Sequence, residues 1–104
     1  GIPVIHSKKQ AEYKKKSDVR ERTNIITERA LRDNINLLYQ RAESLNDKDL
    51  YLQATNDSRK YLKSFPADTS APQIHWNMAL TLDTKLDEYD RAFDEYMRIG
   101  DLYW

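Results

Sequence analysis

The chain of 104 residues contains no cysteine, only two glycines and only three prolines. The absence of cysteine excludes disulfide scaffolds, thiolate metal sites and cysteine nucleophiles. Scarce glycine and proline argue against sandwiches and barrels, which need many turn residues, and favour long helices. No apolar run approaches the roughly 20 residues of a transmembrane helix, and no stretch alternates between apolar and polar residues as a strand does. The sequence therefore predicts an all-α domain.

A net charge of either sign is also missing, because 17 basic residues balance 17 acidic ones. Nothing in this balance draws the whole chain toward nucleic acid. The net charge of zero results from an uneven distribution of charge along the chain. Residues 1–30 contain eight Lys or Arg and four Asp or Glu, a net charge of +4, whereas residues 83–104 contain three and seven, a net charge of −4. The two ends of one chain, or the ends of two copies, can therefore attract each other.

Apolar residues at helical spacing predict one long helix over about residues 7–46. No glycine or proline interrupts this segment, and Ser7 with Gln10 fits a capping box at its start. The apolar positions form two successive stripes along the predicted helix. The first stripe is Val19, Thr23, Ile26 and Ala30, and the second is Leu31, Ile35, Leu38, Ala42 and Leu45.

Three shorter helices are expected to follow the long one. Asp47 and the polar residues around it offer caps for a helix over roughly 48–64, which ends because Pro66 forces the preceding residue out of the helical region. Ser70 is expected to cap the third helix and Asp87 the fourth. The predicted order is therefore one long N-terminal helix and three shorter helices.

Small residues recur at a regular spacing in these helices. Ala42 and Ala54 lie 12 residues apart in two consecutive helices, and Ala79 and Ala92 lie 13 residues apart in the next two. A small residue at a helix crossing lets two antiparallel helices approach closely. The sequence therefore contains two helix pairs that recur after about 37–38 residues, a period typical of helical repeats.

This pattern resembles the tetratricopeptide repeat (TPR) family. The closest matches are His75-Trp76-Asn77-Met78-Ala79 in the third helix and the segment from Glu88 to Tyr96 in the fourth. The first pair departs from the family at Ser58, where an aromatic residue is usual. The resemblance implies two antiparallel helix pairs over residues 36–104 and a helical extension over residues 1–35. Repeat arrays generally need about three units, so we expect a fragment of a longer array.

One part of the chain resembles a bacterial cell-envelope subtype of the TPR family, which includes TolA-binding and BamD-like outer-membrane lipoproteins. The segment that carries this resemblance is Tyr61-Leu62-Lys63-Ser64-Phe65-Pro66, followed by Thr69-Ser70-Ala71-Pro72. It implies a place in the bacterial periplasm or at the outer membrane, reached through an anchor that has been removed. The chain starts at Gly1 without a methionine, which we interpret as a processed or engineered end. A cytoplasmic location stays open.

The TPR resemblance also implies a concave groove lined by the first helix of each pair, where a protein or peptide partner binds. Trp76 and Tyr39 are the expected anchors, because large aromatic rings bury much area with few rotatable bonds. The alternative is that Trp76 packs against a neighbouring helix. The residues expected to line the groove are Asn36, Tyr39, Glu43, Gln73, Trp76, Leu80 and Asp83.

No catalytic or metal-binding pattern stands out, so we predict a protein that is not an enzyme and has no cofactor. The only histidines are His6 and His75, and no nucleophile is paired with a base. His75 is expected to pack in the repeat. A cluster of acidic residues lacks the glycine and the ligand spacing of a calcium loop and is interpreted as a solvated face. Its members are Asp83, Asp87, Asp90 and Asp94.

Three functions remain open. The leading one is a scaffold that binds a peptide or protein segment in the groove. The first alternative is a structural oligomerisation module that uses the long N-terminal helix. The second is binding of nucleic acid or an anionic surface through a patch of lysines that also reads as a solvated helix start. These lysines are Lys8, Lys9, Lys14, Lys15 and Lys16.

The predicted fourth helix carries more aromatic surface than one preceding helix can cover. Leaving several hundred Å² of apolar surface in water forgoes several kcal/mol, at about 25 cal/mol per Å². The expected cover is the first stripe of the long helix, from the same chain or from a second copy. We therefore predict a homo-oligomer, most simply a dimer. The expected self-association residues are Phe93, Tyr96, Ile99, Tyr103 and Trp104.

Overall fold

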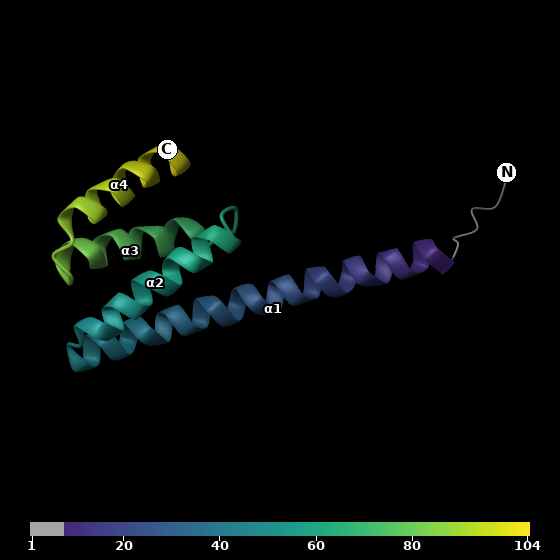
Figure 1. Ribbon diagram of the computed structural model, residues 1–104, viewed down its shortest axis with the longest axis horizontal. Coiled ribbons are helices and arrows are strands. Elements are labelled where there is room, and N and C mark those ends of the chain that lie inside the picture. Colours follow the sequence, from purple (N-terminus) through teal and green to yellow (C-terminus); the bar gives the residue numbers. More distant parts are fainter. Residues whose placement is uncertain (1–7) are drawn as a thin grey trace. The chain divides into compact units, whose positions relative to one another are not determined.

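The computed structural model describes residues 8–104, which form four α-helices and no strand (Figure 1). The helices are α1 (Lys8–Leu45), α2 (Lys48–Ser64), α3 (Ala71–Thr84) and α4 (Tyr89–Tyr103). The prediction of an all-α fold with a long first helix is therefore confirmed. His6 and the capping box expected at Ser7 lie outside the described residues.

The chain divides into two compact units, residues 1–30 and residues 31–104. Within the described part of the first unit, α1 exposes its apolar side chains, including Val19 and Ile26. The second unit contains the end of α1, the three other helices and the hydrophobic core. Ile35 is buried in that core, so the packed part of the chain already includes residues before 36.

A two-residue turn connects α1 to α2. Asn46 has a φ of 49°, a left-handed conformation that asparagine tolerates better than most residues. The N–H of Asp47 then donates to the carbonyl of Ala42 at 3.0 Å, which closes the end of α1. Asp47 caps α2, because its carboxylate accepts hydrogen bonds from the backbone N–H groups of Asp49 and Leu50. The predicted cap and the predicted bounds of the second helix are both confirmed.

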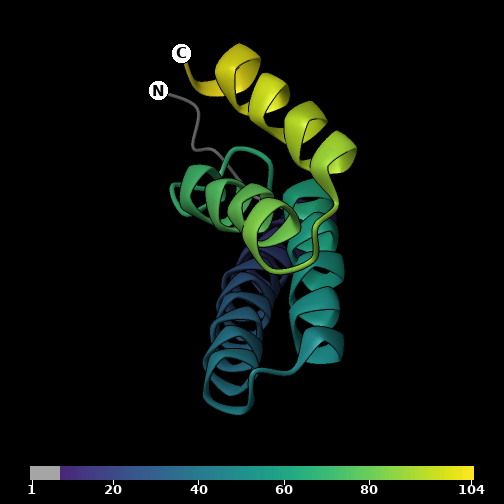
Figure 2. The same ribbon diagram turned by 90° about the vertical axis from the view of Figure 1, so that its left-hand side faces the viewer.

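Two core clusters join the helices of the second unit. The first cluster joins α1, α2 and α3, and the second joins α3 to α4. Leu62 of α2 packs against both clusters, so the core is continuous. Figure 2 shows α3 between α2 and α4. The first cluster contains Ile35, Tyr61, Ala71 and Ile74, and the second contains Met78, Leu82 and Ala92.

The capping predictions for the last two helices need correction. Ser70 occupies the N-cap position of α3, but its side chain makes no capping hydrogen bond. Its N–H donates instead to the carboxylate of Asp68 at 2.9 Å, and this bond lowers the pKa of Asp68. Asp87 has a φ of 54°, which is a turn conformation and not the extended one of a capping residue. Glu88 is the N-cap of α4, and Asp87 accepts a hydrogen bond from the Tyr89 hydroxyl.

Replacing Asp47 with alanine tests the cap of α2. The Asp47→Ala variant removes two hydrogen bonds to otherwise unpaired N–H groups, so we expect it to lower the free energy of unfolding by about 1 kcal/mol. Glu88→Ala is the matched control, because it removes an acidic N-cap side chain that makes no capping bond. Urea unfolding followed by circular dichroism measures both. Equal losses in the two variants would contradict the assignment of the cap.

Candidate functional site

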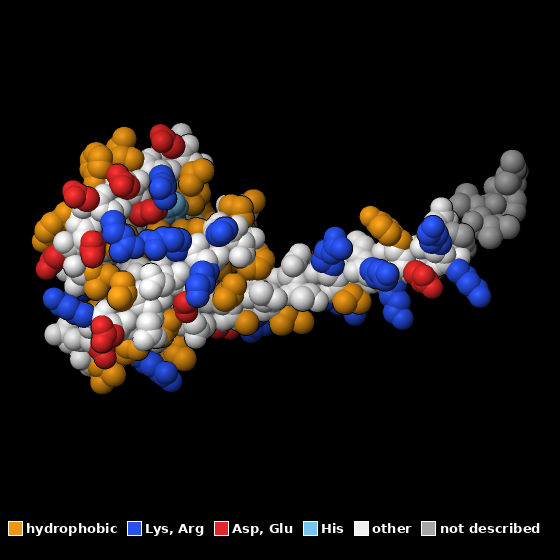
Figure 3. Space-filling model, viewed as in Figure 1, with side chains coloured by type: hydrophobic (Ala, Val, Ile, Leu, Met, Phe, Trp, Pro, Cys, Tyr) orange, Lys and Arg blue, Asp and Glu red, His pale blue; other side chains and the backbone are white. Residues whose placement is uncertain are grey.

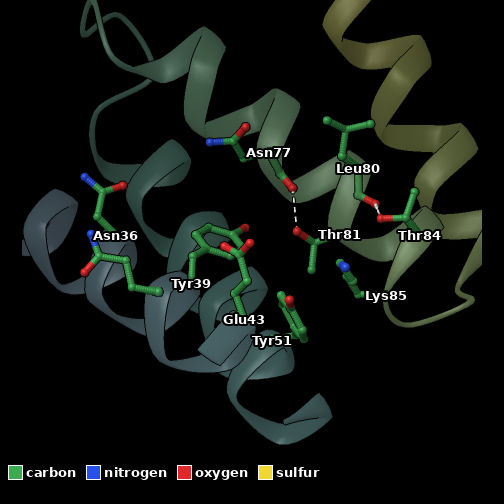
Figure 4. A pocket seen from close by; sticks show the side chains of 10 residues that line it. Asn36, Tyr39, Glu43, Tyr51, Asn77, Leu80, Thr81, Thr84 and Lys85 are labelled. Carbon is green, nitrogen blue, oxygen red and sulfur yellow. Dashed lines mark hydrogen bonds between the residues drawn. The ribbon is translucent and has the colours of Figure 1, made fainter. Parts of the chain in front are cut away.

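A concave groove of about 570 Å³ lies between α1 and α3 in the second unit, with the start of α2 at one end (Figure 4). It forms where side chains at helical spacing on two neighbouring helices face each other. The short α1–α2 turn and the core under α3 hold these faces in place. The lining residues are Asn36, Tyr39, Gln40 and Glu43 of α1, Tyr51 of α2, and Asn77, Leu80, Thr81 and Thr84 of α3, with Lys85 at its C-cap.

Tyr39 belongs both to the groove and to the core. Its ring packs against the first core cluster. Its hydroxyl lies 3.5 Å from the hydroxyl of Ser58 in α2, and the hydroxyl of Thr81 in α3 also interacts with it. Burial raises the pKa of the Tyr39 phenol, and the bonds to Ser58 and Thr81 partly offset this rise. One side chain of α1 therefore links all three helices that form the groove.

Ser58 stands where the repeat pattern expected from the sequence would place an aromatic residue. Its side chain is fully buried, and its hydroxyl donates to the carbonyl of Ala54 at 2.7 Å. An aromatic residue here would occupy the space that the hydroxyl end of Tyr39 fills. At this contact, α1 contributes the large side chain, Tyr39, and α2 contributes the small one, Ser58.

Side-chain amides run along the groove. Asn36 and Gln40 are exposed, and neither side chain makes a hydrogen bond within residues 8–104. The oxygen of the Asn77 amide accepts a bond from Gln73 at 3.0 Å, which leaves its N–H groups available. Each primary amide offers two donors and one acceptor oxygen. The groove can therefore both donate hydrogen bonds to a ligand and accept them from it.

The hydroxyl groups of Thr81 and Thr84 add acceptors to the same surface. Thr81 donates to the carbonyl of Asn77, and Thr84 donates to the carbonyl of Leu80, both at 2.7 Å (Figure 4). Because these protons are used within α3, both oxygens can act as acceptors: the buried Thr81 oxygen interacts with Tyr39, and the exposed Thr84 oxygen is open to a ligand. Leu80 adds an apolar side chain to the groove lining.

One end of the groove carries two opposite charges. Glu43 contributes a carboxylate from α1, and it forms no ion pair with any described residue. Lys85 contributes an ammonium group, whose nitrogen lies 5.6 Å from the centre of the buried Tyr51 ring. Such a contact orients the cation over the ring face. This end can therefore recognise both an acidic and a basic group.

The structure brings four of the residues predicted for the groove together, namely Asn36, Tyr39, Glu43 and Leu80. It places Gln73 and Trp76 at a second cavity of about 460 Å³ toward α4. The Trp76 ring packs on Tyr96, with centroids 5.4 Å apart.

Asp83 is also turned toward α4, where its carboxylate accepts a hydrogen bond from the Tyr96 hydroxyl at 3.1 Å. The face of α3 that borders the groove is thus rotated by about one residue from the expected one. Sequence reasoning missed Asn77, Thr81 and Lys85, although their four-residue spacing places them on one helix face. It also missed Gln40, Tyr51 and Thr84.

A buried polar network joins α3 to α4. His75 Nε2 lies 2.5 Å from the Glu95 carboxylate, and His75 Nδ1 lies 3.1 Å from the Tyr103 hydroxyl. Arg98 donates to the other oxygen of Glu95 at 3.1 Å. The phenol of Tyr103 has a raised pKa because of burial and the nearby charge of Glu95, which favours its neutral form. The predicted packing role of His75 thus includes a polar link between the two helices.

Comparisons with models of protein families, with curated proteins and with solved structures gave no significant match. Within residues 8–104, no three His, Asp or Glu side chains are placed to hold a metal ion. No helix in that range has both the length and the apolar character needed to cross a bilayer. A functional assignment therefore depends on the geometry of the groove and of the exposed surfaces.

A double-mutant cycle tests the network between α3 and α4. His75→Phe leaves the Glu95 carboxylate buried without its histidine partner, so we expect a loss of about 3 kcal/mol in the free energy of unfolding. His75→Phe combined with Glu95→Leu removes both polar partners and should recover most of that loss. Urea unfolding measures the free energies. The Glu95→Leu variant alone completes the cycle. A loss in the double variant equal to the sum of the losses in the two single variants would show that the pair is not coupled.

The stability of the fold should fall at alkaline pH. Because burial raises the pKa of Tyr39 in the folded chain, the unfolded chain releases this proton first, at a pH of about 10. The stabilising contribution is complete below that pH and is lost as the pH rises through the folded-state value. We expect Tyr39→Phe to lose less stability than the wild type between pH 9 and pH 11. Parallel losses in urea unfolding over this range would contradict the prediction.

Proposed function

We propose that this chain is a non-enzymatic interaction module whose groove binds an extended segment of a partner protein. An extended peptide carries backbone N–H and C=O groups that have no partner within the peptide itself. The side-chain amides of Asn36, Gln40 and Asn77 can donate to such C=O groups and accept from such N–H groups. This row of amides above the half-buried Tyr39 ring is the observation that carries the proposal.

The charged end of the groove suggests which charged residues the bound segment contains. Glu43 and Lys85 lie at the ends of the two lining faces, beyond the amides. A segment with a basic residue near Glu43 and an acidic residue near Lys85 would pair both charges. Since these side chains are exposed, each pair contributes up to about 1 kcal/mol and mainly selects the sequence of the segment.

The proposal includes a TPR-like architecture. Ala42, Ala54, Ala79 and Ala92, the small residues of the repeat pattern, have exposed fractions of 0 to 2%. Close helix packing at these positions supports two repeated helix pairs. The proposed place in a bacterial cell envelope depends on the Phe65-Pro66 and Ala71-Pro72 sequences.

Peptide selection followed by a groove variant tests this function. Twelve-residue peptides are selected on the wild-type chain from a random phage-displayed library, and one labelled peptide is measured by fluorescence anisotropy. Asn36→Ala with Asn77→Ala removes two groove amides, so we expect the Kd to rise roughly tenfold. The matched control is Asn24→Ala with Asn56→Ala, which removes two exposed amides outside the groove and should leave the Kd unchanged.

Two results would contradict the proposed function. One is a library that yields no binder above background. The other is a set of selected peptides that bind the groove variant as tightly as the wild type, because their site would then lie elsewhere. Circular dichroism of each variant confirms that the helices are retained.

A further inference from the structure

Helix α4 has an apolar face that its own chain does not cover. Ile99 is only 6% exposed, because it lies on the side of α4 that packs on α3, whereas Phe93 is 63% exposed. Tyr89, Phe93 and Met97 follow each other at four-residue spacing and form an exposed stripe that ends near Trp104. Ile99 is therefore unavailable for the self-association expected from the sequence. Tyr89 and Met97, which were not among the expected self-association residues, are exposed beside Phe93.

An acidic row runs beside this α4 stripe. Asp90 and Asp94 each follow a stripe residue by one position, and Asp101 lies four residues after Met97. All three aspartates are exposed. Figure 3 shows hydrophobic and acidic side chains next to each other in the region of α4. A surface that covers the stripe must therefore be apolar in its centre and basic at its edge.

The first part of α1 has this composition. Val19 and Ile26 are 55% and 68% exposed and share one face with Thr23 and Ala30. We name these four residues the α1 stripe. Lys15 and Arg22, seven residues apart, lie along one edge of the stripe, and Lys16 and Arg20 lie along the other. Three of the four acidic residues of the segment, Asp18, Glu21 and Glu28, lie on the remaining faces, and Glu12 lies in line with the stripe, seven residues before Val19.

The net charges of the two segments agree with this match. Residues 1–30 carry +4 and residues 83–104 carry −4. Contact between two α4 stripes would instead bring two acidic rows together, which repels. A helix gains most of its stability from packing of an apolar face, and the described part of the first unit gives the α1 stripe no such packing. Each stripe therefore needs an apolar partner surface whose border carries the opposite charge.

We propose that the α4 stripe of one copy packs against the α1 stripe of a second copy. Two-fold symmetry then gives two equal contacts, each with an apolar centre and a border of aspartates facing lysines and arginines. The dimer is independent of the groove, whose lining residues belong to other faces.

Paired charge reversal tests the proposed dimer. Asp90→Lys with Asp94→Lys makes the α4 border basic, and Lys15→Glu with Arg22→Glu makes the α1 border acidic. Sedimentation equilibrium at micromolar concentration should give a dimer for the wild type. Each variant alone meets like charges in both contacts, so we expect its dimer Kd to rise at least tenfold. An equimolar mixture of the two variants should again give a dimer, because both contacts of the mixed pair are then complementary.

Arg59→Glu with Lys60→Glu is the control, because it reverses two exposed charges on α2 and should leave the dimer intact. A wild-type chain that stays monomeric throughout the concentration range would overturn the proposal. A dimer that survives both charge reversals would do the same, since its interface would lie elsewhere. A mixture that fails to restore the dimer would show that these two borders do not meet.

Discussion

The packed unit depends on how one phenol, that of Tyr39, is accommodated among three helices. A hydroxyl that is taken out of water without a partner costs about 1–3 kcal/mol. Tyr39 avoids this cost through Ser58 on α2 and Thr81 on α3. Because its ring also packs in the core, the same side chain fixes the helices and forms the floor of the groove. The polar groove is thus a direct consequence of how the core is built.

The sequence predicted the helices well because their signals are local. The bounds of α2 followed from Asp47 and Pro66, and the absence of internal glycine and proline identified the long α1. The caps of α3 and α4 were wrong because a cap depends on backbone angles that residue type does not determine. Asp87 takes a left-handed turn conformation, and the Ser70 N–H is bound by Asp68.

The candidate site was only partly predictable because it depends on the rotation of α3 against α1. The TPR resemblance implied the correct groove residues on α1, but on α3 it implied a neighbouring face, which includes Trp76 and Asp83. The contacts of Trp76 and Asp83 with Tyr96 turn those residues toward α4, which leaves Asn77 and Thr81 in the groove. No local signal reveals this choice, since the partner residue lies in another helix.

The two proposed surfaces differ in the kind of contact they can make. The groove offers amides and hydroxyls, which suit a peptide backbone, whereas the α4 stripe offers apolar side chains beside an acidic row. The two surfaces share no residue among those described, so self-association through α4 would leave the groove open. A scaffold of this kind can bind a partner segment while it is itself a dimer.

The direct test of the groove is the nuclear magnetic resonance spectrum of the side-chain amides in the ¹⁵N-labelled chain. A library-selected peptide is titrated into the protein while the NH₂ signals are followed. We expect the signals of Asn36, Gln40 and Asn77 to shift with the same Kd, while those of Asn24 and Asn56 do not change. Shifts confined to amides outside the groove would contradict it.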